Sequence, residues 1–187
     1  MTESPIRLDL FDNPDFDRGA SRLTEALWIV VQACLFSTWL PGSKWRRALL
    51  RAFGAKIGNG VVIKPHVSIK FPWRLSVGDH SWLGERVWID NLADVKIGAH
   101  SCLSQGAYLC TGSHDWSDVK FALVTRSIEI GDGCWVGARA SIAPGAQLGN
   151  GAIIAMNALG RGNVDENVIV KASGEVVLRP IYSNDDG

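Results

Sequence analysis

Apolar residues return at every sixth position between residues 57 and 165. Fourteen of these fifteen positions hold Ile, Leu or Val, although hydrophobic residues make up only 47% of the chain. The positions are Ile57, Ile63, Ile69, Val77, Leu83, Ile89, Ile97, Leu103, Leu109, Ile130, Val136, Ile142, Leu148, Ile154 and, as the only lapse, Gly160. Except at Trp73, a small or β-branched residue follows each position four places later. This internal repeat indicates a solenoid.

A period of six matches neither an amphipathic helix nor a simple alternating strand. It predicts short strands joined by tight turns, with three hexads in each coil of a parallel β-helix of about five coils. The first three coils begin at Ile57, Val77 and Ile97, twenty residues apart. The next coil begins only at Ile130, which predicts an insertion of thirteen residues between Asp115 and Ser127.

The repeat and the segments that flank it divide the chain into four parts. They are a flexible N-terminal segment (1–22), a helical cap (23–55), the β-helix (56–170, with an inserted loop at 115–127) and a C-terminal segment (171–187). The cap begins with a helix over 24–40, with Ser21 or Thr24 as its N-cap and Pro41-Gly42 as its end. A second helix is predicted over 43–53.

The helical pair has two interpretations. Solenoids need their open ends covered, so the pair is expected to cap the first coil. Alternatively, the basic face with Trp45, Arg46 and Arg47 contacts a membrane surface at its periphery. The apolar run of residues 26–40 is shorter than the ~20 residues needed to span a bilayer.

The charge and cysteine content of the chain indicate which binding partners and which cellular compartment to expect. The 19 basic and 19 acidic residues give a formal net charge of zero, so the whole molecule has no attraction to nucleic acid or to an anionic membrane. The four cysteines lack paired-ligand spacing, and no cleavable signal pattern is found. Reduced thiols and a cytoplasmic location are expected, with the inner membrane face as the site of any peripheral contact.

The position before each repeated aliphatic residue is expected to face solvent, and several of these positions are aromatic. They are Trp82 and Trp135 on one flat of the coil, and Trp88 and Tyr108 on the next. Stacking of successive coils would turn them into exposed strips, which are typical of an interface between subunits. The alternative is a scatter of unrelated surface aromatics.

On the third flat the same register aligns Arg74, Asp94, His114 and Gln147. It predicts that Asp94 lies under His114, where a carboxylate could orient an imidazole. His66, His80 and His100 instead occupy turn positions where Gly is frequent, and His tolerates positive φ. The stacking of His80 on His100 leaves a metal site as the alternative.

The hexads resemble those of the hexapeptide-repeat acyltransferases. The run from Thr111 to His114 is similar to the Thr-x-x-His stretch of galactoside and maltose O-acetyltransferases. With the runs 49–58, 71–73, 88–92 and 104–108, it looks like the acetyltransferases of the colanic-acid-biosynthesis type. The resemblance implies a left-handed β-helix, a homotrimer with sites between subunits, and His114 as general base. It further implies acetyl transfer from acetyl-CoA to a carbohydrate hydroxyl, with no metal required. No serine or cysteine is placed to form an acyl-enzyme with His114, so we expect direct transfer in a ternary complex.

The resemblance also implies binding residues. Asp90 or Asn91 would contact the acceptor, with Trp116 of the insertion beside it. The CoA groove would be lined by Ala138, Met156, Arg161, Gly162 and Arg179. This last coil departs from the family pattern, because Arg161 stands where a Thr-Lys pair is usual; a guanidinium still suits a phosphate.

Two other functions share this architecture. γ-Type carbonic anhydrases use the same solenoid and hold zinc with three histidines, and zinc catalysis needs three protein ligands with an open position. A non-catalytic or degenerate scaffold would need neither a special His nor a long inserted loop. The loop directly after His114 favours an enzyme, because long loops in a regular solenoid are usually functional.

Overall fold

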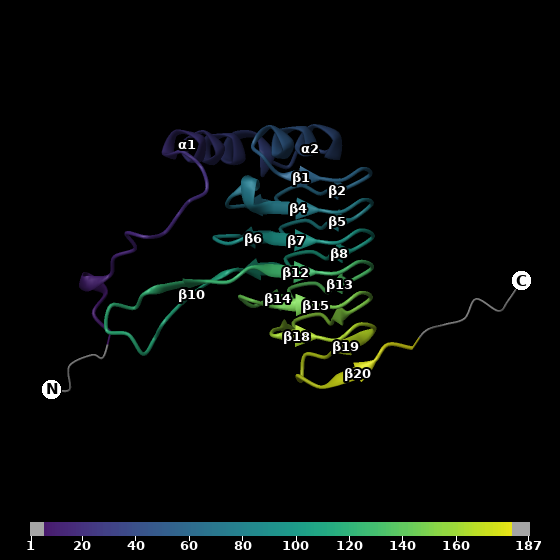
Figure 1. Cartoon of the computed structure of the whole chain (residues 1–187). Coiled ribbons are helices and arrows are strands. Elements are labelled where there is room, and N and C mark those ends of the chain that lie inside the picture. The colour runs from purple at the N-terminus through teal and green to yellow at the C-terminus, as the bar shows by residue number, and fades with distance from the viewer. Residues whose placement is uncertain (1–5, 181–187) are drawn as a thin grey trace, which may run out of the picture.

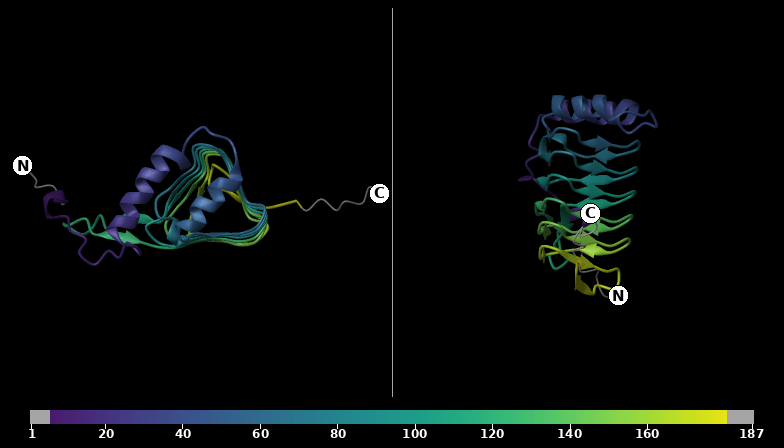
Figure 2. Two further views of the ribbon diagram at one scale, coloured as in Figure 1. Left: turned by 90° about the horizontal axis from the view of Figure 1, so that it is seen from above. Right: turned by 90° about the vertical axis from the view of Figure 1, so that its right-hand side faces the viewer.

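The computed structural model, which describes residues 6–180, is a stack of short strands with two helices across one end (Figures 1 and 2). Viewed along the stack, the coils superpose as a triangle (Figure 2). Its sides are three sheets, here called A, B and C. Sheet A contains β1 (Lys56–Ile57), β4 (Leu75–Val77), β7 (Val95–Ile97), β12 (Ile128–Ile130), β15 (Gln147–Leu148) and β18 (Asn163–Val164).

Sheets B and C complete each turn of the coil. Sheet B contains β2 (Val62–Ile63), β5 (Trp82–Leu83), β8 (Cys102–Leu103), β13 (Trp135–Val136), β16 (Ile153–Ile154), β19 (Val168–Val170) and β20 (Val176–Leu178). Sheet C contains β3 (Ser68–Ile69), β6 (Trp88–Asp90), β9 (Tyr108–Cys110), β14 (Ser141–Ile142) and β17 (Leu159–Gly160). The stack has about six turns rather than the expected five, because β18 and β19 continue it beyond the fifteen hexads.

The register follows the hexad count. Ile97 pairs with Val77 on one side and with Ile130 on the other, and these inward side chains are buried. On the outside, Trp82 and Trp135 both flank Cys102, and the rings of Trp88 and Tyr108 lie 4.7 Å apart. The predicted outward aromatic strips are therefore present, and the three tryptophans are about half exposed.

The corner between sheets A and B carries a ladder of buried polar side chains. Ser81 Oγ donates to the Gly98 carbonyl and accepts from the backbone N–H of Ser101. Ser101 Oγ repeats this one coil later, donating to Gly131 and accepting from Cys134 N–H. The small residue at this position thus satisfies backbone groups that a sharp turn leaves without a strand partner.

The turn histidines adopt the conformation predicted for them. His66, His80 and His100 have φ values of 60°, 57° and 54°. The rings of His80 and His100 stack 5.3 Å apart. These residues occupy left-handed turn positions that Gly fills in other coils.

The helical cap contains α1 (Arg22–Val31), the π-helical turn η2 (Gln32–Phe36) and α2 (Ser43–Ala52). Ser21 is the N-cap, as predicted, because its side chain accepts from the backbone N–H of Thr24. Trp28 and Phe36 face the solenoid and are fully buried. Two short 3-10 turns, η1 (Leu8–Leu10) and η3 (Pro72–Arg74), complete the helical elements among the described residues.

The cap side chains terminate the open edge of the first coil. Five carbonyls of that coil, which have no preceding strand to pair with, each accept a hydrogen bond from a cap side chain. The pairs are Ile57 with Arg51, Val61 with Arg47, Ile63 with Ser43, Val67 with Ser37, and Ile69 with Trp28. Two of the basic side chains of α2, Arg47 and Arg51, thus help to close the solenoid.

Arg46 ties the two helical segments together. Its guanidinium is buried and donates to the carbonyls of Phe36, Gly42 and Thr38 at 2.9–3.0 Å. Burial lowers the pKa of this group from its ordinary value. The end of η2 and the link to α2 therefore share one side-chain donor, which lies on α2.

The register can be tested at its centre. Ile97→Asp places an unpaired carboxylate in the aliphatic column, and we expect the free energy of unfolding to fall by about 4 kcal/mol or more. Ser76→Asp, on the outer face of the same sheet, is the matched control. Thermal melting followed by circular dichroism measures both; an unchanged melting temperature for Ile97→Asp would refute the register.

The cap can be tested at Arg46. Arg46→Met removes a side-chain donor from the carbonyls of Phe36, Thr38 and Gly42, of which Phe36 is fully buried, and should lower the free energy of unfolding by about 3 kcal/mol. Lys44→Met on the exposed side of the same helix should change it by less than about 0.5 kcal/mol. Urea titration distinguishes them, and equal stabilities would contradict the role of Arg46.

Candidate active site

The insertion after the third coil is an antiparallel hairpin at the corner between sheets C and A, here called the C–A corner. It is formed by β10 (Gly112–His114) and β11 (Leu123–Thr125), and it projects away from the stack (Figures 1 and 2). The backbone N–H of Arg126 donates to the Thr111 carbonyl at 2.9 Å, which closes the hairpin at its base. The chain therefore leaves and rejoins the coil at one point.

His114 is held by the loop that joins the two strands of this hairpin. Its Nδ1 lies 2.8 Å from the carbonyl oxygen of Phe121, and the two rings stack at 4.2 Å with an interplanar angle of 2°. Phe121 has a φ of 52°, a left-handed conformation. Because a carbonyl only accepts hydrogen bonds, this contact places the proton of a neutral imidazole on Nδ1 and leaves the lone pair on Nε2.

Residues 7–13 of the N-terminal segment lie along the hairpin. The Arg7 backbone N–H donates to the Val119 carbonyl, and the ring of Phe11 lies 5.5 Å from that of His114. Asn13 Oδ1 accepts from the backbone N–H of Leu123. This segment thus covers one side of the histidine.

A cavity of about 400 Å³ opens beside the same histidine. Its walls come from the hairpin and from the turn of the next coil: Ser113, His114, Asp115, Trp116, Val124, Arg126 and Pro144. Trp116 lies on this cavity and is 78% exposed, so two of the predicted site residues meet here. A side-chain hydrogen bond from Ser117 lowers the pKa of Asp115, which keeps this carboxylate charged at the rim.

Sequence reasoning missed Arg126. It directly follows the hairpin, and its exposed guanidinium makes no hydrogen bond or ion pair with the described residues. A charged residue at the return point of an insertion is a signal that could have identified it. Its position gives the cavity one cationic wall.

The predicted pairing of Asp94 with His114 is wrong. The Asp94 carbonyl accepts from the backbone N–H of Ile128, so Asp94 stacks against the start of β12. The hairpin lifts His114 out of the coil, and simple counting of hexads therefore fails for it. The partner that orients its imidazole is the Phe121 carbonyl.

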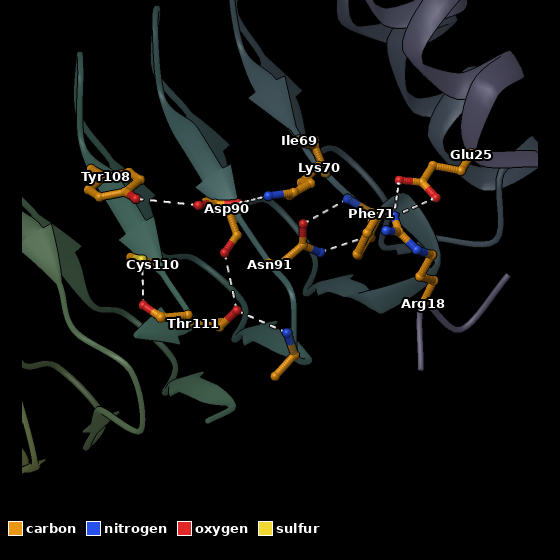
Figure 3. Close-up of polar contacts among 12 residues, drawn as sticks. Arg18, Glu25, Ile69, Lys70, Phe71, Asp90, Asn91, Tyr108, Cys110 and Thr111 are labelled. Carbon is orange, nitrogen blue, oxygen red and sulfur yellow. Dashed lines mark hydrogen bonds and ion pairs between the residues drawn. The ribbon is translucent and has the colours of Figure 1, made fainter. Parts of the chain in front are cut away.

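The expectation for Asn91 also needs correction. Asn91 is fully buried, and its side-chain amide accepts from Phe71 N–H and donates to the Phe71 carbonyl (Figure 3). An amide with both ends engaged inside a corner has no group left for an acceptor. Asn91 is part of the corner, not of an open site.

Thr111 has a similar role one coil later. Its buried hydroxyl donates to the Asp90 carbonyl and accepts from the backbone N–H of Ala93 (Figure 3). The threonine of the Thr-x-x-His stretch therefore anchors the base of the hairpin that carries His114.

Asp90 remains available at the end of sheet C, though only 16% of its side chain is exposed. It lies 3.1 Å from Lys70 Nζ and 3.5 Å from the hydroxyl of Tyr108 (Figure 3). Burial, with added contributions from Cys110 and Asp90, raises the pKa of Tyr108, so this hydroxyl stays protonated. Lys70, Asp90 and Cys110 occupy aligned positions on successive coils leading to the hairpin.

The structure does not bring the predicted CoA-groove residues together within one chain. Ala138 and Met156 lie at the corner between sheets B and C, where the Asn157 backbone N–H donates to Ala138. Arg161 and Gly162 lie at the C–A corner, two coils beyond the hairpin. Arg179 donates to the Gly151 carbonyl at the third corner.

The histidines are likewise dispersed. His80 and His100 lie at the A–B corner, His66 at the B–C corner and His114 at the C–A corner, so no three of them meet within one chain. In the part of the chain that the structure describes, no group of three or more His, Cys, Asp or Glu side chains could hold a metal ion. None of the helices there is long and apolar enough to cross a membrane.

Comparisons with known proteins agree with this architecture. The family model described as bacterial transferase hexapeptide (six repeats) matches residues 127–159. The acetyltransferase WcaF of Escherichia coli K12, assigned by its name to colanic acid biosynthesis, is 40% identical over 171 residues. The match covers 90% of this chain and 93% of WcaF.

Solved structures share the fold at low sequence identity. A hexapeptide-repeat acetyltransferase of Vibrio cholerae, determined with acetyl-CoA, has a TM-score of 0.76 at 20% identity, covering 91% of this chain and 94% of its own. A maltose O-acetyltransferase of Clostridium difficile has the same TM-score at 17% identity, covering 87% of this chain and 90% of its own. The predicted left-handed β-helix is confirmed.

The anchor of the hairpin can be tested at Thr111. Thr111→Val keeps the shape but removes the hydroxyl that Ala93 N–H donates to and one of the two donors to the Asp90 carbonyl, and should cost about 1–3 kcal/mol of stability. Thr125→Val, in which the side chain makes no hydrogen bond with the described residues, is the control. Chemical denaturation measures both; a Thr111 variant as stable as wild type would contradict the anchoring role.

Proposed function

The chain belongs to the hexapeptide-repeat acetyltransferases, and on this premise we propose that it transfers an acetyl group from acetyl-CoA to a saccharide hydroxyl, with His114 as general base. The observation that carries the proposal is the contact between His114 Nδ1 and the Phe121 carbonyl at 2.8 Å. It supports a tautomer with a basic Nε2 beside the cavity. The name of WcaF supports an exopolysaccharide or its precursor as the acceptor class.

The imidazole of His114 transfers a proton twice in the proposed reaction. Nε2 accepts the proton of the acceptor hydroxyl as its oxygen attacks the thioester carbonyl. When the C–S bond breaks, the imidazolium returns the proton to the departing thiolate. Such general acid–base catalysis typically contributes about 10²–10⁴-fold.

Direct transfer in a ternary complex fits the surroundings of His114. Ser113 also lines the cavity, but its hydroxyl makes no hydrogen bond with His114 among the described residues. An activated nucleophile is normally within hydrogen-bond reach of its base. We therefore assign no acyl-enzyme step to this serine.

The surroundings also suggest roles for the remaining polar groups. Arg126 lines the cavity, its guanidinium forms no ion pair with the described residues, and it is suited to an anionic group of either substrate. Asp90, held by Lys70 at the end of sheet C, is the proposed contact for an acceptor hydroxyl. Trp116 offers an exposed ring against which a sugar could pack.

A trimer would resolve the dispersal of the donor-binding residues. Ala138 and Met156 at the B–C corner of one subunit could face Arg161 and Gly162 at the C–A corner of the next. The outward aromatic strips, with Trp82 and Trp135 on sheet B, support such a side-by-side interface. Each site would then be shared between two subunits.

The proposal is tested with His114→Ala, measured by thiol release from acetyl-CoA across a panel of saccharides and lipid-linked oligosaccharides. Turnover should fall by about 10²–10⁴-fold, because the hydroxyl then lacks its base. Calorimetric CoA binding and the mass from light scattering should be retained.

Asp94→Asn is the matched control and should keep wild-type turnover, since Asp94 stacks on β12 rather than on the histidine. Turnover of His114→Ala within tenfold of wild type on the true acceptor would remove His114 from the mechanism.

A further inference from the structure

The helical cap presents an apolar face away from the solenoid. Leu23, Leu27 and Val30 lie on the side of α1 opposite the buried Trp28, and they are 80%, 54% and 58% exposed. The helices of the cap lie at one end of the stack (Figure 1), and this face is on the side of α1 away from the residue that packs on the coils. No other described element covers it.

The apolar surface continues beyond α1. Leu35, Trp39 and Leu40 follow it, and Trp39 is 72% exposed. Between residues 22 and 43 the only charged side chains are Arg22 and Glu25, and Glu25 is paired with Arg18. An exposed apolar surface of this extent usually marks a site of interaction.

Basic and acidic residues are unevenly distributed along the stack, although the chain as a whole has a formal net charge of zero. Residues 20–78, which form the cap and the first coil, hold nine of the 19 basic residues and only one of the 19 acidic residues. Arg46, Arg47 and Arg51 bond to carbonyls and form no ion pair with the residues that the structure describes. Exposed Arg22 and Lys44 have no ion pair among the described residues.

We propose that the cap is a docking surface for an anionic lipid bilayer. Leu23, Leu27 and Trp39 enter the interface, and the exposed Arg22 and Lys44 side chains lie at the phosphate headgroups. Apolar groups next to cations fit this partner better than nucleic acid, which offers no apolar surface at its backbone. End-to-end contact with a second copy would bring two strongly positive ends together, which like-charge repulsion opposes.

The contact is peripheral, because the ten residues of α1 fall short of the ~20 needed to span a bilayer. The same helices close the first coil with their inner face, so capping and docking use opposite sides of one element. The inference is independent of the acetyl-transfer proposal.

The test is cosedimentation of the full chain with vesicles of phosphatidylcholine alone or mixed with phosphatidylglycerol. At low ionic strength, the wild-type protein should bind the mixed vesicles and should bind the neutral vesicles only weakly. The double variant Leu27→Gln, Trp39→Gln should weaken binding at least about tenfold, since it removes two apolar side chains that enter the bilayer interface. Lys44→Gln should weaken it about fivefold, and salt should reduce it further.

Leu178→Gln is the control, because Leu178 is 81% exposed at the opposite end of the stack. Circular dichroism verifies that each variant is folded, which the exposure of the changed side chains favours. The proposal is overturned if wild type fails to sediment with anionic vesicles, or if Leu178→Gln weakens binding as much as the double variant. A lower mass of the double variant in light scattering would also overturn it, since the face would then join copies of the chain.

Discussion

Backbone hydrogen bonds between coils are the interaction on which this molecule depends. Each strand is only two or three residues long, and its N–H and C=O groups find partners only on the coils above and below. The ends therefore need other partners. Cap side chains supply them to the first coil, and β20 pairs antiparallel with β19 at the other end. A solenoid of this kind is stable as a stack and not as separate coils.

The same constraint shapes the candidate site. An insertion can interrupt the stack only if the chain returns to the rung that it left, and the bond from Arg126 to Thr111 achieves this. His114 then belongs to the hairpin and not to the coil. Its orientation is consequently set within the hairpin, by the Phe121 carbonyl, while the coil contributes the base on which the hairpin stands.

Local repetition made the fold predictable. The hexads identified the coil, its register and the left-handed turns at His66, His80 and His100, because each property depends on a few neighbouring residues. His114 and Trp116 were found through the insertion. Asp94 was misplaced because an insertion breaks the counting, and the polar Asn91 gave no sign that both ends of its amide are buried. The N-terminal segment has no periodicity, so its contact with the hairpin could not be foreseen.

The closed base of the hairpin has a consequence for how such proteins can diverge. The imidazole, the carbonyl that orients it and most of the cavity wall lie between two adjacent points of the chain, and each doubling of a loop adds only about 0.6 kcal/mol of closure entropy. The hairpin can therefore change without a change in the coils that carry it. A change in the length or side chains of the hairpin would alter the cavity, and with it the preference for an acceptor, without disturbing the buried aliphatic core of the coils.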